Sequence, residues 1–220
     1  MNIFLVLVVL LIGKILYAKE SLSLINEDYI RNYLTHEAPY YASHGASDNY
    51  LGAGLLYYAL AYSQKAKVCV CLGSGGGFVP RVMCQSQRDL HLTDAITILV
   101  DGNIGNWGRP LWLSPDSFFR TNFPEIKIIL DTTHHAAMTW DKDLRINYLH
   151  IDADHSLEGS WQDFIDYLPL MAPYGIITFH DTQGLLPCAK TVDRIIKKGF
   201  EVVNFKEFGA GVAIIHLGKN

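Results

Sequence analysis

Short apolar runs alternate with stretches of helical character along most of this 220-residue chain. Several of these runs are apolar at nearly every position, which is typical of strands that are covered on both faces. Strands that alternate with helices form a parallel sheet, because each return connection crosses over as a helix. The pattern predicts strands at residues 67–72, 95–100, 126–130, 146–151 and 176–179.

Two further apolar runs, residues 201–205 and 212–217, are joined by a glycine-rich turn. They are too close for a crossover helix, so we expect them to pair antiparallel. The chain is therefore predicted to adopt an α/β fold, a Rossmann-like, doubly wound, mostly parallel seven-stranded sheet with an antiparallel C-terminal hairpin. The expected helices include one over residues 50–65, with its start signal at Ser47 or Asp48, and one over residues 157–171.

The N-terminal residues 3–12 are apolar and are followed by Lys14 and Lys19. This run is short for a spanning helix, which needs ~20 residues, and it fits a signal peptide or a membrane anchor. Lysines on its C-terminal side favour membrane association with the following domain in the cytoplasm, and a cleaved signal with export is the alternative. We divide the chain into this segment (1–18), a helical lead-in or cap (19–66) and the sheet domain (67–220).

The charge balance limits the partners of the chain. The net charge is −4 and no block of Lys or Arg is present. A dedicated nucleic-acid binder normally shows a basic face, so no nucleic-acid partner is expected. A small molecule or a sugar remains as the candidate substrate. The oligomeric state is not indicated.

A glycine-rich turn, Gly73-Ser74-Gly75-Gly76-Gly77, follows the first strand and opens a helix. Glycines let the backbone turn sharply and let a ligand approach it closely. Asp101 ends the next strand, where a carboxylate accepts hydrogen bonds from a ribose diol. The turn and Asp101 therefore indicate a nucleotide-type cofactor. Taken alone, these two features also fit a nicotinamide-dependent oxidoreductase.

Acidic residues and histidines also end the fourth and fifth strands, as Asp152-Ala153-Asp154-His155 and His180-Asp181. Clustered carboxylates usually hold a cation or share a proton. Oxygen ligands suit Mg²⁺, Mn²⁺ or Ca²⁺, so Asp152 and Asp181 are the candidate metal ligands. His155 or Asp154 is the candidate catalytic base for a hydroxyl proton. The alternative for Asp154 is that it only caps the following helix.

This combination of motifs resembles the class I S-adenosylmethionine-dependent methyltransferases, and within them methyltransferase family 24. The motifs are Gly73-x-Gly75-x-Gly77, Asp101, Asp152-x-Asp154-His155-Ser156-x-Glu158-Gly159, and the run from Leu168 to Asp181. The resemblance implies that S-adenosylmethionine binds at Gly73, Ser74, Gly75 and Gly77, with Asp101 on its ribose and Asp131 near its adenine. In metal-dependent relatives the acids that match Asp152 and Asp181 bind a divalent cation, which would here be Mg²⁺ or Mn²⁺.

Two positions depart from the family pattern. Cys71 stands where the family usually has Glu or Asp, and Thr182 stands where some relatives carry a third metal ligand. The resemblance implies methylation of a hydroxyl on a small molecule or glycan. It leaves open whether a divalent metal ion assists the transfer. The departures motivate a second hypothesis, a catalytically decayed cofactor-binding scaffold. An oxidoreductase is disfavoured, because the sequence has no Tyr-x-x-x-Lys pattern.

Overall fold

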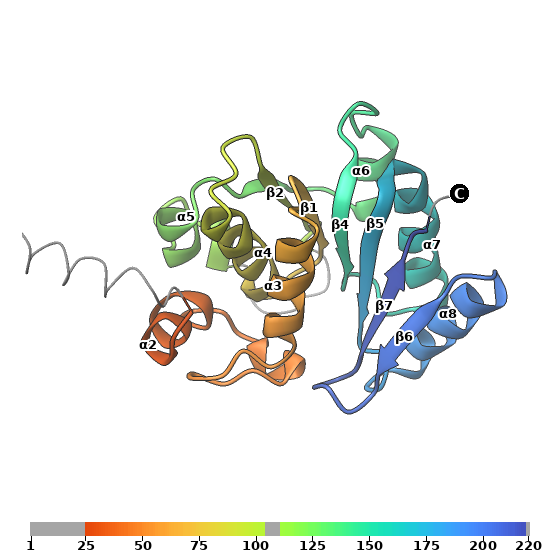
Figure 1. Cartoon of the computed structure of the whole chain (residues 1–220), viewed down its shortest axis with the longest axis horizontal. Coiled ribbons are helices and arrows are strands. Elements are labelled where there is room, and N and C mark those ends of the chain that lie inside the picture. Colours follow the sequence, from red (N-terminus) through yellow and green to blue (C-terminus); the bar gives the residue numbers. More distant parts are fainter. Residues whose placement is uncertain (1–24, 104–110, 219–220) are drawn as a thin grey trace, which may run out of the picture.

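The computed structural model describes residues 25–103 and 111–218, which form a seven-stranded sheet with helices on both faces (Figure 1). The strand order is β3-β2-β1-β4-β5-β7-β6. The first five strands pair in parallel, and β7 pairs antiparallel with both β5 and β6. The strands are β1 (Val68–Leu72), β2 (Ile96–Val100), β3 (Lys127–Ile129), β4 (Ile146–Ile151), β5 (Met171–His180), β6 (Val202–Phe205) and β7 (Val212–His216). The predicted fold class is confirmed.

Strand β1 shows why the sheet needs cover on both faces. All five of its residues are buried. Cys69 and Cys71 belong to one hydrophobic core, whereas Val68, Val70 and Leu72 belong to a second core. Successive side chains of a strand point to opposite faces, so this division places one core on each side of the sheet.

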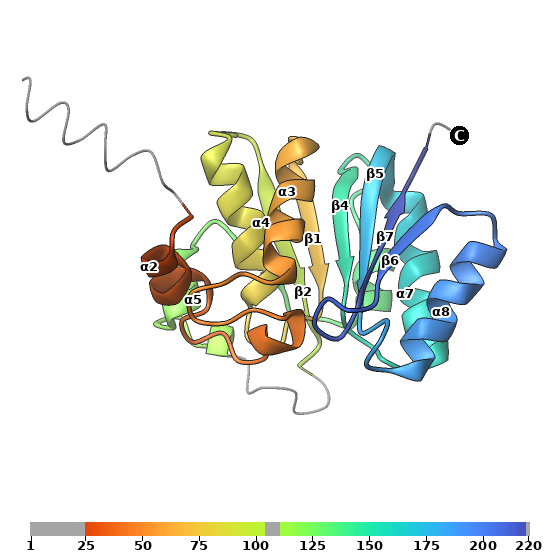
Figure 2. The same cartoon turned by 60° about the horizontal axis from the view of Figure 1, so that its bottom comes forward.

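The helices cover the two faces in pairs, as Figures 1 and 2 show. Helices α3 and α4 contribute to the core that contains Cys69, and α7 and α8 contribute to the core that contains Val70. Short helical turns η3 (Leu111–Leu113) and η4 (Leu168–Leu170) connect elements. The helices are α3 (Ala53–Ser63), α4 (Phe78–Asp89), α5 (Phe118–Asn122), α6 (Thr133–Met138), α7 (Leu157–Tyr167) and α8 (Leu186–Lys197).

Two helix boundaries differ from the sequence-based expectation. Helix α3 begins at Ala53 after Gly52, and not at Ser47 or Asp48, because Ser47 pairs with Tyr50 in a tight turn. Helix α7 ends at Tyr167, and β5 already begins at Met171. Pro169 explains the early stop, since proline has no N–H for a helix interior.

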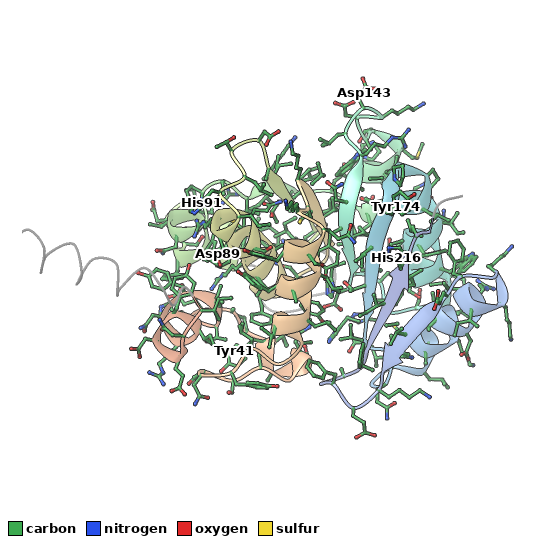
Figure 3. All side chains as sticks on the ribbon, viewed as in Figure 1. Tyr41, Asp89, His91, Asp143, Tyr174 and His216 are labelled. Atoms are coloured by element: carbon green, nitrogen blue, oxygen red, sulfur yellow. The ribbon has the colours of Figure 1, made fainter. Side chains whose placement is uncertain are left out.

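The N-terminal segment, residues 25–45, runs beside the end of the sheet where the strands finish (Figure 2). It contains α2 (Glu27–Tyr29), η1 (Ile30–Leu34) and η2 (Tyr41–His44). Figure 3 labels Tyr41 on this segment, and its hydroxyl donates to Asp48 Oδ1 at 2.8 Å.

A buried arginine on α4 anchors this segment. The Arg81 guanidinium donates to the backbone carbonyls of Tyr33 (3.1 Å), His36 and Glu37 (3.2 Å). Its charged group also lies 5.4 Å from the Phe119 ring centroid. Charge-assisted hydrogen bonds of this kind are stronger than neutral ones, so Arg81 fixes the segment that continues to His44.

Residues 25–103 and 111–218 include no helix of the length and apolarity that a membrane crossing requires. The apolar run at residues 3–18, on which the membrane prediction rests, lies outside the described residues.

Candidate active site

A cavity of about 770 Å³ opens at the carboxyl ends of the parallel strands. Such sheets bind ligands at this edge. One wall comes from the N-terminal segment, and the others come from the loops after β1, β2, β3, β4 and β5. The lining includes most of the predicted site residues, namely Gly73, Ser74, Gly75, Asp101, Asp152, Asp154, His155 and Asp181.

The glycine turn forms a cradle that side chains would fill. Gly73 has φ +67°, and a Cβ there would lie 2.2 Å from the Asp152 carbonyl oxygen. Gly75 has φ +50°, and a Cβ there would touch the Tyr40 ring at 3.0 Å. Ser74 Oγ is buried and has no hydrogen-bond partner among the described residues. The turn therefore offers an open backbone and an unsatisfied hydroxyl to a ligand.

Gly77 has a different place from the other turn residues. It precedes α4 as the N-cap residue, with φ +82°, and it does not line the cavity. A Cβ there would lie 2.7 Å from the Phe119 ring. Gly77 thus shapes the start of the helix, and its predicted contact with the cofactor stays a prediction.

Asp101 lies directly after β2 and faces the cavity. Burial raises the pKa of its carboxyl, and hydrogen bonds from backbone amides act in the opposite direction. One of these comes from Asn103, whose amide donates to Asp101 Oδ1 at 2.7 Å. A carboxylate in this position can accept hydrogen bonds from ligand hydroxyls.

Asp131 does not line the cavity, although the two residues after it, Thr132 and Thr133, do. Its carboxylate contacts His135 Nδ1 across the first turn of α6. The contact with His135 lowers the pKa of Asp131. Its predicted position near an adenine stays a prediction.

Asp152 is the centre of the site, and four imidazoles surround it. Its Oδ1 lies 3.2 Å from His155 Nε2 and 3.3 Å from His180 Nδ1. Its Oδ2 lies 3.8 Å from His44 Nε2 and 3.9 Å from His150 Nε2. Burial opposes ionisation of this carboxyl, yet His180, His150 and His155 hold its pKa well below the usual range. Asp152 is therefore ionised at neutral pH.

His155 bridges the carboxylates that follow β4 and β5. Its Nε2 lies 3.2 Å from Asp152 Oδ1 and 3.1 Å from Asp181 Oδ2. The hydrogen bond to Asp152 raises the pKa of His155, against the effect of burial. The side chain is 28% exposed and lines the cavity. The structure thus brings Asp152, His155 and Asp181 together, and their predicted roles stay predictions.

Asp181 has a left-handed backbone, with φ +59°. Aspartate is among the residues that tolerate this conformation, which six other non-glycine residues of the described chain also adopt. It turns the chain sharply at the end of β5, where the Asp181 carboxylate also lies 3.5 Å from His180 Nδ1.

Asp154 accepts a hydrogen bond at the start of α7. Its Oδ1 accepts from the Ser156 amide at 2.8 Å, and Ser156 Oγ accepts from the Gly159 amide. A Cβ at position 159 would lie 2.0 Å from Asp154 Oδ2, so glycine leaves room for the carboxylate. Ser156 is thus the N-cap residue of α7, and Asp154 stabilises the same helix start through the Ser156 amide, whereas its role as a base stays a prediction.

The two departures from the family pattern have local partners. Cys71 is fully buried, and its thiol donates to the Gly73 carbonyl at 3.0 Å. Thr182 is also buried, and its hydroxyl donates to Asn204 Oδ1 on β6 at 2.8 Å. Thr182 is therefore engaged away from the carboxylates of Asp152 and Asp181.

The sequence pattern did not predict His44 or His150 as site residues, and it gave His180 no role. His150 interrupts an otherwise largely apolar strand, and that interruption is the signal that could have identified it. His44 has no comparable signal, because it comes from a loop far from the strands in sequence. Burial lowers the pKa of His44, whereas the carboxylates of Asp152 and Asp181 outweigh burial and raise that of His180 to about 10.

Comparison with known proteins agrees with this architecture. The described fold is that of the class I methyltransferases. A family model for a methyltransferase domain, methyltransferase family 24, matches residues 70–182, which is just over half of the chain. The chain belongs to this family. A search of curated proteins found no match.

Solved structures of methyltransferases share the fold at low sequence identity. The O-methyltransferase TomG from Streptomyces achromogenes, in complex with S-adenosylmethionine, has a TM-score of 0.66 and 14% identity over 92% of this chain and 95% of its own. The O-methyltransferase from Bacillus cereus, in complex with S-adenosylhomocysteine, has a TM-score of 0.61 and 13% identity over 91% and 95%. The methyltransferase PaMTH1 from Podospora anserina has a TM-score of 0.58 and 16% identity over 76% and 78%.

Proposed function

We propose that the chain is an S-adenosylmethionine-dependent O-methyltransferase that acts on the hydroxyl of a small molecule or glycan. The observation that carries the proposal is that His155 bridges Asp152 and Asp181 in the same cavity as the glycine turn and Asp101. The cofactor-bound O-methyltransferases with the same fold support it.

The residues at the cofactor end fit S-adenosylmethionine. The glycine turn leaves the backbone open to a ligand, and Ser74 Oγ is a buried hydroxyl without a partner among the described residues. Asp101 is placed to accept hydrogen bonds from the ribose hydroxyls. When bound, the cofactor supplies an electrophilic methyl group on a sulfonium.

The residues at the acceptor end position a hydroxyl and receive its proton. As the new oxygen–carbon bond forms and the carbon–sulfur bond breaks, the hydroxyl proton would pass to His155 Nδ1, because Nε2 donates to the carboxylates. The carboxylates of Asp152 and Asp181, both within 3.2 Å of Nε2, would stabilise the resulting imidazolium. Orientation of the acceptor in the cavity supplies a large part of the rate gain.

The donor set does not fit the Mg²⁺ or Mn²⁺ site of metal-dependent relatives. These ions prefer oxygen ligands. Here both oxygens of Asp152 face imidazole nitrogens, and Thr182 donates to Asn204 instead of facing the carboxylates. Such an ion therefore takes no part in the proposed transfer.

The cavity also favours a class of acceptor. The cavity is lined by the carboxylates of four residues, Asp101, Asp152, Asp154 and Asp181. Among the described residues, its lining contains neither Lys nor Arg. These carboxylates would repel an anionic acceptor, and the protonated imidazole of His180 offsets only part of their charge. We expect neutral or cationic hydroxyl compounds to be preferred over phosphorylated or carboxylated ones.

The test begins with calorimetric titration of S-adenosylmethionine and S-adenosylhomocysteine into the full-length chain. Saturable binding is expected. An acceptor screen by mass spectrometry should then find a mass gain of one methyl group on a hydroxyl compound. A folded sample that binds neither ligand would refute the proposal, and binding with no turnover would favour the decayed scaffold.

A matched pair of variants tests the role of His155. We expect His155→Gln to lower kcat by ~10²-fold or more, with little change in cofactor affinity. His134→Gln is the control, because His134 is exposed, contacts Asp166 and does not line the cavity. Equal activity of the two variants would exclude His155 as the proton acceptor.

For the N-terminal residues 1–18 we propose membrane association with the methyltransferase domain in the cytoplasm. The support is the apolar run followed by Lys14 and Lys19. Fractionation of cells that express the full chain should place it in the membrane pellet, resistant to carbonate extraction. Recovery of a shortened chain outside the cell would instead support a cleaved signal peptide.

A further inference from the structure

Three of the imidazoles around Asp152 are buried, and the proposed methyl transfer gives them no role. His44, His150 and His180 are buried, with 5%, 0% and 2% exposure. They come from the N-terminal segment, β4 and the end of β5. The cluster thus unites a residue outside the matched methyltransferase domain with two inside it.

In each of these imidazoles, one ring nitrogen is held by an oxygen and the other faces Asp152. His44 Nδ1 contacts the Tyr57 hydroxyl at 3.1 Å, and His150 Nδ1 contacts Thr178 Oγ1 at 2.8 Å. His180 Nε2 contacts the Ser43 carbonyl at 3.3 Å. Metal-binding histidines usually have this arrangement, because the partner of the second nitrogen fixes the tautomer and the ring orientation.

The distances suit ligands of one ion. Ligand atoms of His44, Asp152 and His180 all lie within 4.8 Å of one another. His180 Nδ1 is 3.3 Å from Asp152 Oδ1, and His44 Nε2 is 3.8 Å from Asp152 Oδ2. With metal–ligand bonds of ~2.0–2.2 Å, ligands around one ion lie roughly 3 to 4.3 Å apart.

His150 gives a second, independent indication. Its Nε2 is buried without a hydrogen-bond partner among the described residues, and it lies 3.9 Å from Asp152 Oδ2. Buried polar atoms are nearly always satisfied, and an unsatisfied one calls for an ion, a water or a ligand. A water bound to a metal ion beside Asp152 would satisfy this nitrogen.

We infer that His44, Asp152 and His180 form a binding site for a divalent transition metal such as Zn²⁺, with His150 beside it. A nitrogen-rich set selects Zn²⁺ or its neighbours over Mg²⁺ and Ca²⁺. Because His44, Asp152 and His180 line the cavity, the ion keeps one side open to a ligand. His155 and Asp181 remain outside this set. The inference rests on the cluster alone and not on the proposed methyl transfer.

The test uses the full-length chain, stripped with a chelator and titrated calorimetrically with ZnCl₂ and with MgCl₂. We expect one equivalent of Zn²⁺ to bind and Mg²⁺ to bind at least ~100-fold more weakly. His44→Gln and His180→Gln should each weaken Zn²⁺ binding by ~10-fold or more. His134→Gln removes an exposed histidine outside the cluster and should leave Zn²⁺ affinity unchanged.

Several results would overturn the inference. These are no saturable Zn²⁺ binding, equal affinity for the two metals, or the same Zn²⁺ affinity in the cluster variants as in His134→Gln. If His180→Gln does not fold, His44→Gln still tests the site, since His44 lies outside the sheet. Titration of Co²⁺ into the unaltered chain provides a second readout, because a four- or five-coordinate protein-bound Co²⁺ absorbs visible light much more strongly than the octahedral aqueous ion.

Titration of S-adenosylmethionine into the same samples separates the two proposals. Cofactor binding without Zn²⁺ binding would refute the metal site only, and the histidines would then form an ion-pair cluster with Asp152. Zn²⁺ binding without cofactor binding would refute the proposed function only.

Discussion

Asp163 on α7 is a buried carboxylate that no cation neutralises among its described contacts. It is 3% exposed, Oδ1 accepts from Thr133 Oγ1, and Oδ2 has no hydrogen-bond partner among the described residues. Burial raises its pKa to about 7. An unfolded aspartate has a pKa of ~3.9, so the native state keeps the proton over about three pH units in which the unfolded chain loses it.

The sign and size of the effect follow from this difference. Between pH ~4 and ~7 the native state binds more protons than the unfolded state, so the free energy of unfolding falls by ~1.4 kcal/mol per pH unit. The total loss from this residue is about 4 kcal/mol, complete slightly above pH 7. The asparagine of Asp163→Asn cannot ionise and can keep the hydrogen bond from Thr133. The free energy of unfolding of this variant therefore does not undergo the fall with pH that Asp163 causes.

Urea unfolding at pH 4.5 to 8.5 measures the effect as the difference in unfolding free energy between Asp163→Asn and the unaltered chain. That difference should grow with pH in favour of the variant and become constant above neutrality. Asp193→Asn, at an exposed position on α8, controls for loss of a surface charge. A difference for Asp163→Asn that stays flat across this range would refute the reasoning.

Three further predictions concern the cradle, the anchor and the ribose site. Gly73→Ala should lower the free energy of unfolding by ~2 kcal/mol or more, measured by urea denaturation, because its Cβ would lie 2.2 Å from the Asp152 carbonyl. Arg81→Met should cost ~3 kcal/mol and speed proteolytic cleavage within residues 25–45, since three carbonyls lose their donor; an unchanged digestion pattern would contradict this. Asp101→Asn should weaken S-adenosylmethionine binding ~10-fold by calorimetry, or ~1.4 kcal/mol, whereas the exposed control Asp94→Asn should not.

The sheet and the cofactor end were predictable from the sequence because both depend on local patterns. Apolar runs mark strands that are buried on two faces, and residues that follow parallel strands meet at one edge of the sheet. Gly73, Asp101, Asp152 and Asp181 could therefore be placed together without a structure. The structure confirms that all four line one cavity.

The remaining features depend on tertiary contacts that a linear pattern does not record. His44 reaches Asp152 through tertiary contacts, which include the Arg81 anchor and the hydrogen bond from the Ala210 amide to the Ser43 carbonyl. The end of α7 was placed too late because the apolar pattern continues past Pro169 into β5. The contact of Asp154 with the start of α7 needed the position of the Ser156 amide.

The anchor formed by Arg81 binds main-chain oxygens, and this has a consequence for the side chains nearby. Replacement of the side chains at positions 33, 36 and 37 leaves the carbonyls that Arg81 grips in place. Arg81 thus attaches this wall of the cavity, whereas other residues form the surface that the wall presents to a ligand. A library that varies Pro39, Tyr40 and Ser43, which line the cavity, could alter acceptor preference while the sheet and the attachment stay intact.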